Sequence, residues 1–331
     1  MKLKKWDGNP ILKPTGAGNW EKVAVLNPGA WYENGTVYML YRASGEFTDY
    51  KIYFGLATSK DGYHFERASD KPVVSPEVKD LDAGCIEDAR IVKFGDTFYV
   101  TYACRALPPE MFWQGRAPKY PDTAPRVLKE NLTRSAILTS KDLRTFKRFG
   151  AITHDDVDDR DVIIFPEKVN DKYIMFHRPA EWIGPKYGTE KPGIWIAESD
   201  DLLNWKNEYL LAVPEYEWEI KKIGGGTPPI KTDKGWLVIY HGVNAAHVYR
   251  AGAMMLDLKN PRKIIARCPH FILEPETVFE KEGFVKNVVF PTGNVVIGDT
   301  LFVYYGGADT VCCVATVNLK EFVDDIMKYK V

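Results

Sequence analysis

The sequence lacks the long apolar segments that mark membrane and exported proteins. No window approaches the roughly 18 uninterrupted apolar residues of a membrane-spanning helix. The amino terminus, MKLKKWDGNPILKP, contains no apolar stretch of the ~7 to 15 residues that a signal peptide requires. We therefore expect a chain that has no membrane partner and is not marked for export.

Cysteine is also scarce. The chain has five cysteines, an odd number, and none of them forms a CxxC pair. This pattern is typical of free thiols in a reducing compartment, so a cytoplasmic location is expected. The six histidines and five cysteines show no HExxH or paired-cysteine spacing, which argues against a protein-built metal site. The Gly-rich GGGTPPI lacks the GK[ST] of a phosphate-binding P-loop, and no cofactor is expected.

An excess of charge of either sign is absent as well. The 44 Lys and Arg residues balance 45 Asp and Glu residues, leaving a formal charge of -1. Bulk charge therefore cannot hold a nucleic acid, and no nucleic-acid partner is expected. Any small anion must be bound by a few cations that folding brings together.

What the sequence does contain is a fivefold internal repeat. A turn signal followed by an aromatic and β-branched run recurs as GTVYMLY, DTFYVTY, DKYIMFH, KGWLVIY and DTLFVYY, with last residues 41, 102, 177, 240 and 305 and spacings of 61, 75, 63 and 65. Each copy follows one strand-like stretch, and the first three precede another strand and a polar turn, so each unit supplies about four strands. We predict an all-β fold, a five-bladed β-propeller, occupying residues 1–331 as one catalytic domain. A two-domain β-sandwich is the alternative, but it gives no reason for a fivefold period.

Two segments fall outside the repeat. LPPEMFWQGRAPKYPDTAPRV, between the second and third copies, is predicted to be a long loop over one face. The carboxy-terminal LKEFVDDIMKYK has an apolar stripe of Leu319, Phe322, Val323 and Ile326, which predicts a helix over about 318–329. That helix is expected to pack outside the propeller or on a second copy of the chain, so a homo-oligomer is an expected partner.

The starts of the repeat units are the places to look for a ligand site, because innermost strands converge on the propeller axis. They read VLNPGAWY, CIEDARIV, VIIFPEKV, GGGTPPIK and VVFPTGNV. In CIEDARIV, strict alternation would put Asp88 and Arg90 on one face and Glu87 on the other, so one carboxylate would face the axis. Asp88 between apolar neighbours fits a general acid, although an Asp88–Arg90 ion pair is the structural alternative.

Cations and aromatic residues lie beside several strand ends. The cations and histidines are Arg42, Arg134, Arg160, Lys168, His177, Arg178 and His241. Each alone suits a surface charge or a core histidine, but around one axis they would bind a compact anion such as phosphate. Aromatic residues at the openings and in the long loop, among them Trp113 and Tyr240, suit either packing or stacking on sugar rings.

The ordered set NPGA, YR, EDAR, FPEK with HRP, GGTPPI with IYHG, and FPTGN with YYGGADT resembles glycoside hydrolase family 130, the β-mannoside phosphorylases and related β-mannosidases. The resemblance implies a glycosyl-transferring enzyme that cleaves β-mannosides with inorganic phosphate and inverts the anomeric centre, giving α-mannose 1-phosphate. It implies Asp88 as the general acid, acting through the 3-hydroxyl of the mannose. It assigns phosphate binding to Arg134, Arg160 or Lys168, Tyr240 and His241, and substrate binding to Asn27, Arg42, Arg90, Arg178 and Asp309.

The substrate class implied is a short oligosaccharide containing β-linked mannose, with inorganic phosphate as co-substrate. We expect β-1,4-mannosyl-glucose, β-1,4-mannosyl-N-acetylglucosamine or a β-1,4-mannooligosaccharide, while a β-1,2 linkage stays open. A β-mannosidase on the same propeller and a non-catalytic propeller scaffold are the two alternatives. The basic residues around the axis favour the phosphorylase.

Overall fold

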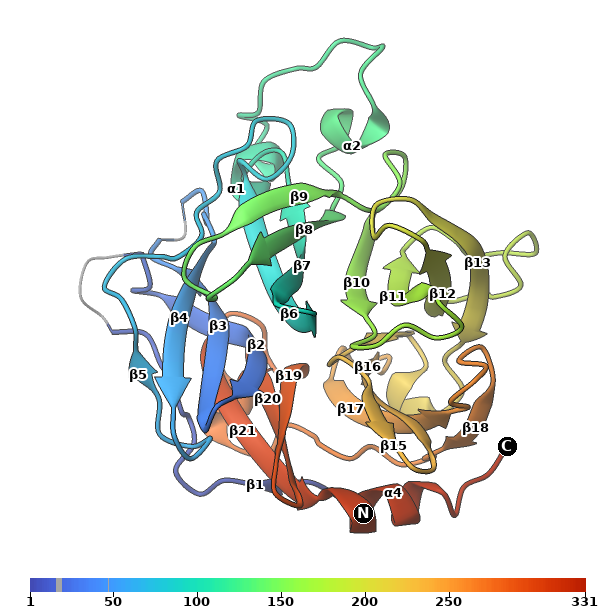
Figure 1. The fold of residues 1–331 in the computed structure, drawn as a ribbon. Coiled ribbons are helices and arrows are strands. Elements are labelled where there is room, and N and C mark those ends of the chain that lie inside the picture. Colours follow the sequence, from blue (N-terminus) through green and yellow to red (C-terminus); the bar gives the residue numbers. More distant parts are fainter. Residues whose placement is uncertain (16–19, 47) are drawn as a thin grey trace.

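Five β-sheets surround a central axis in the computed structural model, which describes residues 1–15, 20–46 and 48–331 (Figure 1). Blade one comprises β2 (Ala24–Glu33), β3 (Thr36–Ser44), β4 (Tyr53–Ser59) and β5 (Glu66–Arg67). Blade two comprises β6 (Cys85–Phe94), β7 (Thr97–Arg105), β8 (Arg134–Ser140) and β9 (Lys147–Ala151). Blade three comprises β10 (Asp159–Ile164), β11 (Tyr173–Pro179), β12 (Ile194–Ser199) and β13 (Trp205–Ala212). The predicted five-bladed propeller is confirmed.

The last two blades show how the ring closes. In blade four the innermost strand is split into β14 (Lys222–Gly225) and β15 (Ile230–Thr232), and both pair with β16 (Gly235–Val243), followed by β17 (Tyr249–Leu256) and β18 (Ile264–Arg267). Pro228 and Pro229 lie in the break, where missing N–H donors interrupt the ladder. Blade five combines β19 (Val289–Ile297), β20 (Thr300–Gly307) and β21 (Val311–Asn318) with β1 (Lys4–Lys5), so the amino terminus completes the carboxy-terminal blade.

The five repeated aromatic runs form the second strand of each blade, β3, β7, β11, β16 and β20. Their side chains alternate between two neighbouring blades, and one hydrophobic cluster fills each junction. Cys312 packs in the cluster between blades five and one, while Cys313 packs in the cluster between blades four and five. The core therefore lies between the blades.

A buried unit of three side chains recurs in four of the blades. The tyrosine that ends the second-strand run donates a hydrogen bond to an acidic residue from the preceding loop, in the pairs Tyr41–Glu21, Tyr102–Asp82, Tyr240–Glu219 and Tyr305–Glu280. A cation from the outermost strand binds the same acid, namely Arg67, Arg148, Arg267 and Lys5. We call this the Tyr–acid–cation unit. It joins the second strand of these four blades to the outermost strand, and blade three has His177 at the tyrosine position.

The helices lie outside the blades. α1 (Pro109–Trp113) and α2 (Arg126–Lys129) belong to the long excursion between β7 and β8, which extends beyond the ring in Figure 1. A 3-10 turn (Glu217–Glu219) precedes β14, and α3 (Val278–Lys281) precedes β19. α4 (Leu319–Ile326) is shorter than predicted, and its Phe322, Val323 and Ile326 are buried against blades four and five. Its apolar stripe is thus covered within the chain. No helix among the described residues is long and apolar enough to cross a membrane.

Candidate active site

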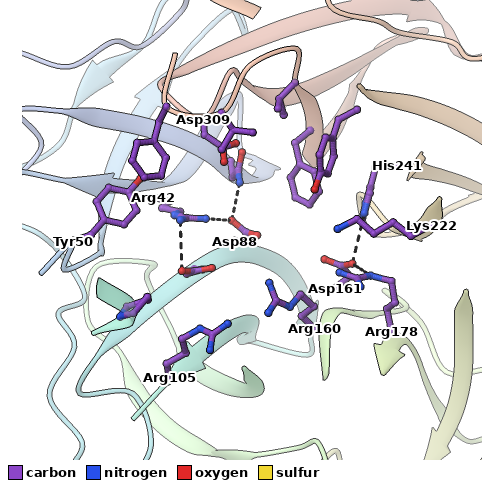
Figure 2. Close-up of a pocket in the computed structure, with 18 of the residues that line it drawn as sticks. Arg42, Tyr50, Asp88, Arg105, Arg160, Asp161, Arg178, Lys222, His241 and Asp309 are labelled. Atoms are coloured by element: carbon purple, nitrogen blue, oxygen red, sulfur yellow. Dashed lines mark hydrogen bonds and ion pairs between the residues drawn. The ribbon is translucent and has the colours of Figure 1, made fainter. Parts of the chain in front are cut away.

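A cavity of about 420 Å³ opens on the axis, at the face where the innermost strands begin. Figure 2 shows two groups among the side chains that line it, with Arg42, Asp88 and Asp309 in one and Arg160, Asp161, Arg178, Lys222 and His241 in the other. All five blades contribute to its lining. The site is therefore built from residues that are far apart in the sequence and that only ring closure brings together.

Three innermost strands carry a β-bulge at the cavity. Asn27 in β2, Asp88 in β6 and Asp161 in β10 have positive φ values of 44°, 56° and 57°, and the strand register shifts at each of them. Asn and Asp adopt this left-handed conformation more readily than most residues. The equivalent positions of three blades thus present a short polar side chain to the axis.

The bulge in β6 corrects the expectation from strict strand alternation. Because the backbone turns at Asp88, both Glu87 and Asp88 line the cavity, whereas alternation would direct only one carboxylate there. Arg90 donates a hydrogen bond to the backbone carbonyl of Asp88, not to its carboxylate, and another of 3.0 Å to the carbonyl of Gly226. The alternative of an Asp88–Arg90 carboxylate ion pair is therefore wrong.

The Asp88 carboxyl faces polar neighbours. Asn27 Nδ2 donates to its Oδ1 at 2.8 Å, and Arg42 Nη1 donates to the same oxygen at 3.1 Å. Arg42 Nη2 lies 3.5 Å from Glu87 Oε1. Asp309 completes this group, and burial raises its pKa to about 6, with Asp88 and Glu87 adding to the rise and Arg42 opposing it. This half of the cavity holds three carboxyl groups around one guanidinium.

The opposite half holds most of the cations. Arg178 Nε lies 2.5 Å from Asp161 Oδ2, and His241 Nε2 lies 3.7 Å from the same oxygen. Burial and the neighbouring Arg178 lower the pKa of Lys222 to about 8. Burial lowers the pKa of His241 to about 3, so its ring is neutral at neutral pH. Arg160 lies at the edge of this group, where Asp158 accepts hydrogen bonds of 2.8 and 2.7 Å from it. We call Arg160, Arg178 and Lys222, together with the neutral His241 beside them, the cationic cluster.

Gly224 allows this cluster to assemble. A Cβ atom at this position would lie 2.3 Å from Asp161 Oδ2, 2.5 Å from His241 Cε1 and 2.9 Å from Arg178 Nε. The first glycine of GGGTPPI therefore leaves room for the side chains of blades three and four to meet. A glycine is needed at this position because the three side chains approach its backbone too closely for a Cβ atom to fit.

The structure brings together seven of the residues predicted for the site. These are Asn27, Arg42, Asp88, Arg160, Arg178, His241 and Asp309, which all line the cavity. Arg90 is buried behind its wall, with its guanidinium 5.8 Å from the ring centroid of Phe290. The expected apolar surroundings of the Asp88 carboxyl are replaced by Arg42 and Asn27.

The other three predicted phosphate ligands lie elsewhere. Lys168 is exposed in the β10–β11 turn, where its Nζ lies 4.2 Å from the centroid of the Tyr173 ring. Arg134 begins β8 and lies 3.1 Å from Asp155 Oδ1. Tyr240 is fully buried in the Tyr–acid–cation unit of blade four. None of the three lines the cavity.

The structure adds Glu87, Arg105, Asp161 and Lys222 to the charged lining. Asp161 was missed because FPEK was aligned with the starts of the other units, whereas the innermost strand of blade three is β10, which contains DRDVII. The sequence signal for Asp161 is an Asp that precedes a β-branched run, as in DRDVII and in EDARIV. Lys222 lies two residues before the first glycine of GGG, and its side chain lines the cavity. Among the described residues, no group of three His, Cys, Asp or Glu side chains could hold a metal ion.

The sequence profile of glycoside hydrolase family 130, described as beta-1,4-mannooligosaccharide phosphorylase, matches residues 4–110 and 127–328. The chain belongs to this family. The family match spans every blade and omits only the region of the long excursion and the two ends.

Curated relatives are similar to this protein over nearly the whole chain. A 1,2-beta-oligomannan phosphorylase of Thermoanaerobacter sp. (strain X514) is 41% identical over 97% of this chain and 99% of its own length. A beta-1,2-mannobiose phosphorylase of the same organism is 39% identical, with the same coverage of both chains. The beta-1,2-mannobiose phosphorylase of Listeria innocua, solved with beta-1,2-mannobiose, superposes with a TM-score of 0.81 at 29% identity, covering 98% of this chain and 99% of that one.

Proposed function

We propose that this family 130 member is an inverting phosphorylase that cleaves β-1,2-linked manno-oligosaccharides with inorganic phosphate and releases α-mannose 1-phosphate. The observation that carries the proposal is the division of one cavity into a carboxyl half around Asp88 and a cationic half around Arg178. An inverting reaction needs a proton donor on one side of the sugar and a nucleophile on the other. The two halves supply these functions.

In this reaction the bond between the anomeric carbon and the glycosidic oxygen breaks, and a phosphate oxygen bonds to that carbon from the opposite face. The leaving oxygen needs a proton, and Asp88 is the group that we assign to supply it, directly or through a sugar hydroxyl. Asn27 and Arg42 hold the Asp88 carboxyl in place through its Oδ1, which leaves Oδ2 for the proton transfer. To Arg42 and Asp309, which line the same half of the cavity, we assign contacts with hydroxyls of the same mannose.

The cationic cluster is the proposed phosphate site. Arg160, Arg178 and Lys222 give three positive charges in a chain whose formal charge is -1, while the single N–H of the neutral His241 ring donates from Nδ1 to the carbonyl of Gly225. Guanidinium groups match phosphate oxygens in pairs, while an ammonium acts as a point charge. Phosphate is already an anionic nucleophile, so neither a protein base nor a cofactor is required. This arrangement favours the phosphorylase over the β-mannosidase and over a scaffold without activity.

The linkage is part of the proposal. The sequence motifs led us to expect a β-1,4-mannoside, and a β-1,4-mannooligosaccharide phosphorylase of Ruminococcus albus is 29% identical to this chain. The β-1,2-acting relatives from Thermoanaerobacter are 41% and 39% identical, which supports a β-1,2 linkage. We also propose a cytoplasmic enzyme, because all five cysteines are buried free thiols.

The experiment is incubation with β-1,2-mannobiose and with β-1,4-mannobiose, each with and without phosphate, with the product identified by NMR. We expect α-mannose 1-phosphate from the β-1,2 substrate only when phosphate is present. Asp88→Asn keeps the size and one acceptor oxygen, and should lower kcat by about 10² to 10⁴-fold. The matched control is Asp200→Asn, at a surface carboxylate bound to Lys172 and Lys206. Equal mannose release without phosphate would instead identify a hydrolase.

A further inference from the structure

An aromatic wall borders the open side of the cavity, beyond the carboxyl half. It consists of Tyr50 from the β3–β4 loop, Phe284 from the segment before β19, and Trp113 at the end of α1, and all three line the cavity. We call these three residues the aromatic rim. The Phe284 ring stacks on that of Tyr50, with centroids 4.8 Å apart and planes 20° apart. Phe284 is therefore held in a fixed orientation by a buried neighbour.

Exposure increases along the rim from the floor of the cavity outward. Tyr50 is 5% exposed, Phe284 50% and Trp113 66%. Tyr50 lies beside Arg42 of the carboxyl half (Figure 2), and the charge of Arg42 acts on the Tyr50 hydroxyl. Large aromatic side chains usually bury most of their surface, so two half-exposed rings at the mouth of a polar cavity indicate a surface for a ligand.

Two charged residues that the proposed reaction does not use, Glu87 and Arg105, line the same cavity as the rim. Glu87 lines the cavity and contacts Arg42 through one oxygen. Arg105 ends β7 and binds the backbone carbonyl of Asn131, and its Nη2 lies 3.7 Å from Asp158. A carboxylate and a guanidinium beside aromatic faces are groups that bind the hydroxyls and the C–H face of a neutral sugar.

We propose that the aromatic rim binds the part of the oligosaccharide on the leaving-group side of the cleaved bond. Phe284, with Glu87 and Arg105, contacts the first mannose beyond that bond, and Trp113 contacts the second. The proposal rests on the proposed function, because the cationic cluster must hold phosphate on the other side. Trp113 should therefore affect the cleavage of the trisaccharide and longer substrates only. Phe284 should affect the cleavage of every substrate.

The test compares Trp113→Ala and Phe284→Ala with the wild-type enzyme on β-1,2-mannobiose and β-1,2-mannotriose. Loss of one stacked ring face should lower kcat/KM about tenfold. We expect Trp113→Ala to lose this factor on the trisaccharide and to change less than about twofold on the disaccharide. Phe284→Ala should lose it on both. The KM for phosphate should be unchanged in both variants. The control is Tyr209→Ala, an exposed aromatic residue on the outermost strand of blade three.

Three outcomes would overturn the proposal: wild-type kinetics of Trp113→Ala on the trisaccharide, an equal loss on both sugars for that variant, or a rise in the KM for phosphate. A drop in molar mass by light scattering in the alanine variants would also overturn it, since the rim would then be a contact between subunits. Calorimetric binding of β-1,2-mannotriose without phosphate separates this proposal from the proposed function. A wild-type protein that binds the sugar more tightly than Trp113→Ala but forms no mannose 1-phosphate would support the rim and contradict the phosphorylase.

Discussion

The Tyr240 hydroxyl donates a hydrogen bond of 2.8 Å to Glu219, and Arg267 binds the same carboxylate. Tyrosine, acid and cation stand in the same relation in blades one, two and five, so this contact belongs to the repeat. The resemblance to family 130 implies a phosphate ligand at Tyr240. Its hydroxyl instead lies inside the blade, bound to a buried carboxylate, which favours a structural role.

Tyr240→Phe should therefore lower stability and leave the chemistry unchanged. The variant loses the bond that the hydroxyl donates to Glu219 and the longer one, of 3.3 Å, that it accepts from Arg267 Nε, at a cost of about 1 to 3 kcal/mol, while Glu219 keeps Arg267 as a partner. The free energy of unfolding and the KM for phosphate are the two measurements. Tyr102→Phe, which removes the same hydroxyl from blade two, is the matched control and should behave alike. A large rise in the KM for phosphate with wild-type stability would contradict the structural role.

The repeat could be predicted from the sequence because it consists of contiguous runs, and these became β3, β7, β11, β16 and β20. The closing strand β1 could not, because two residues, Lys4 and Lys5, carry no strand pattern of their own. Their pairing with β21 depends on ring closure. The short helix α4 was predicted from its apolar stripe, and only its ends differed.

The site could be predicted only in part. Asn27, Asp88 and Arg178 sit in short distinctive motifs, and all line the cavity. The joint presence of Glu87 and Asp88 was not predictable by alternation, since it depends on the positive φ of Asp88. Lys168 was misplaced because the unit boundary in blade three was set at FPEK, beyond the innermost strand. Local motifs thus found Asn27 and Asp88, whereas the position of the innermost strand in blade three decided Asp161 and Lys168.

Asp161 should be required for the stability of the protein without phosphate. Its carboxylate is the counter-charge of the buried Arg178, and removal of one partner of a buried pair costs about 3 kcal/mol or more. Asp161→Asn, which suits the left-handed backbone, should lower the melting temperature. Added phosphate should stabilise the variant more than the wild type, because the anion supplies the missing charge. Equal melting temperatures of Asp161→Asn and the wild type without phosphate would show that Asp161 is not required for stability. Asp200→Asn is the surface control.

Phosphate binding should weaken as the pH rises through the pKa of Lys222, about 8 in the free protein. The ammonium is charged below that pH and neutral above it, so the dissociation constant should rise by up to about tenfold per pH unit above 8. His241 does not titrate in this range, since burial lowers its pKa to about 3. Lys222→Arg keeps the charge and should flatten the profile. Calorimetric titration with phosphate from pH 7 to 9.5 measures the dissociation constant of the wild type and of Lys222→Arg. If the two constants depend on pH in the same way, Lys222 is not the group that titrates.

The buried Asp309 should lower the stability of the folded protein at neutral pH. Burial raises its pKa to about 6 from an ordinary value of 3.8, so folding disfavours the ionised form. The folded state therefore binds more protons than the unfolded state between about pH 4 and 6, and this contribution to stability is lost as the pH rises through 6. Asp309→Asn removes the penalty and should stabilise the protein by about 1 to 2 kcal/mol at pH 7.5 and by less at pH 5.

The same variant should bind the mannoside more weakly, because a carboxylate accepts stronger hydrogen bonds from hydroxyls than an amide does. Asp299→Asn, in the exposed β19–β20 turn, removes one negative charge far from the cavity and controls for net charge. Thermal unfolding at the two pH values and kcat/KM for the mannoside are the measurements. A stability gain that does not change with pH would show that the burial of Asp309 is not its cause. A gain together with full activity would exclude Asp309 from substrate binding.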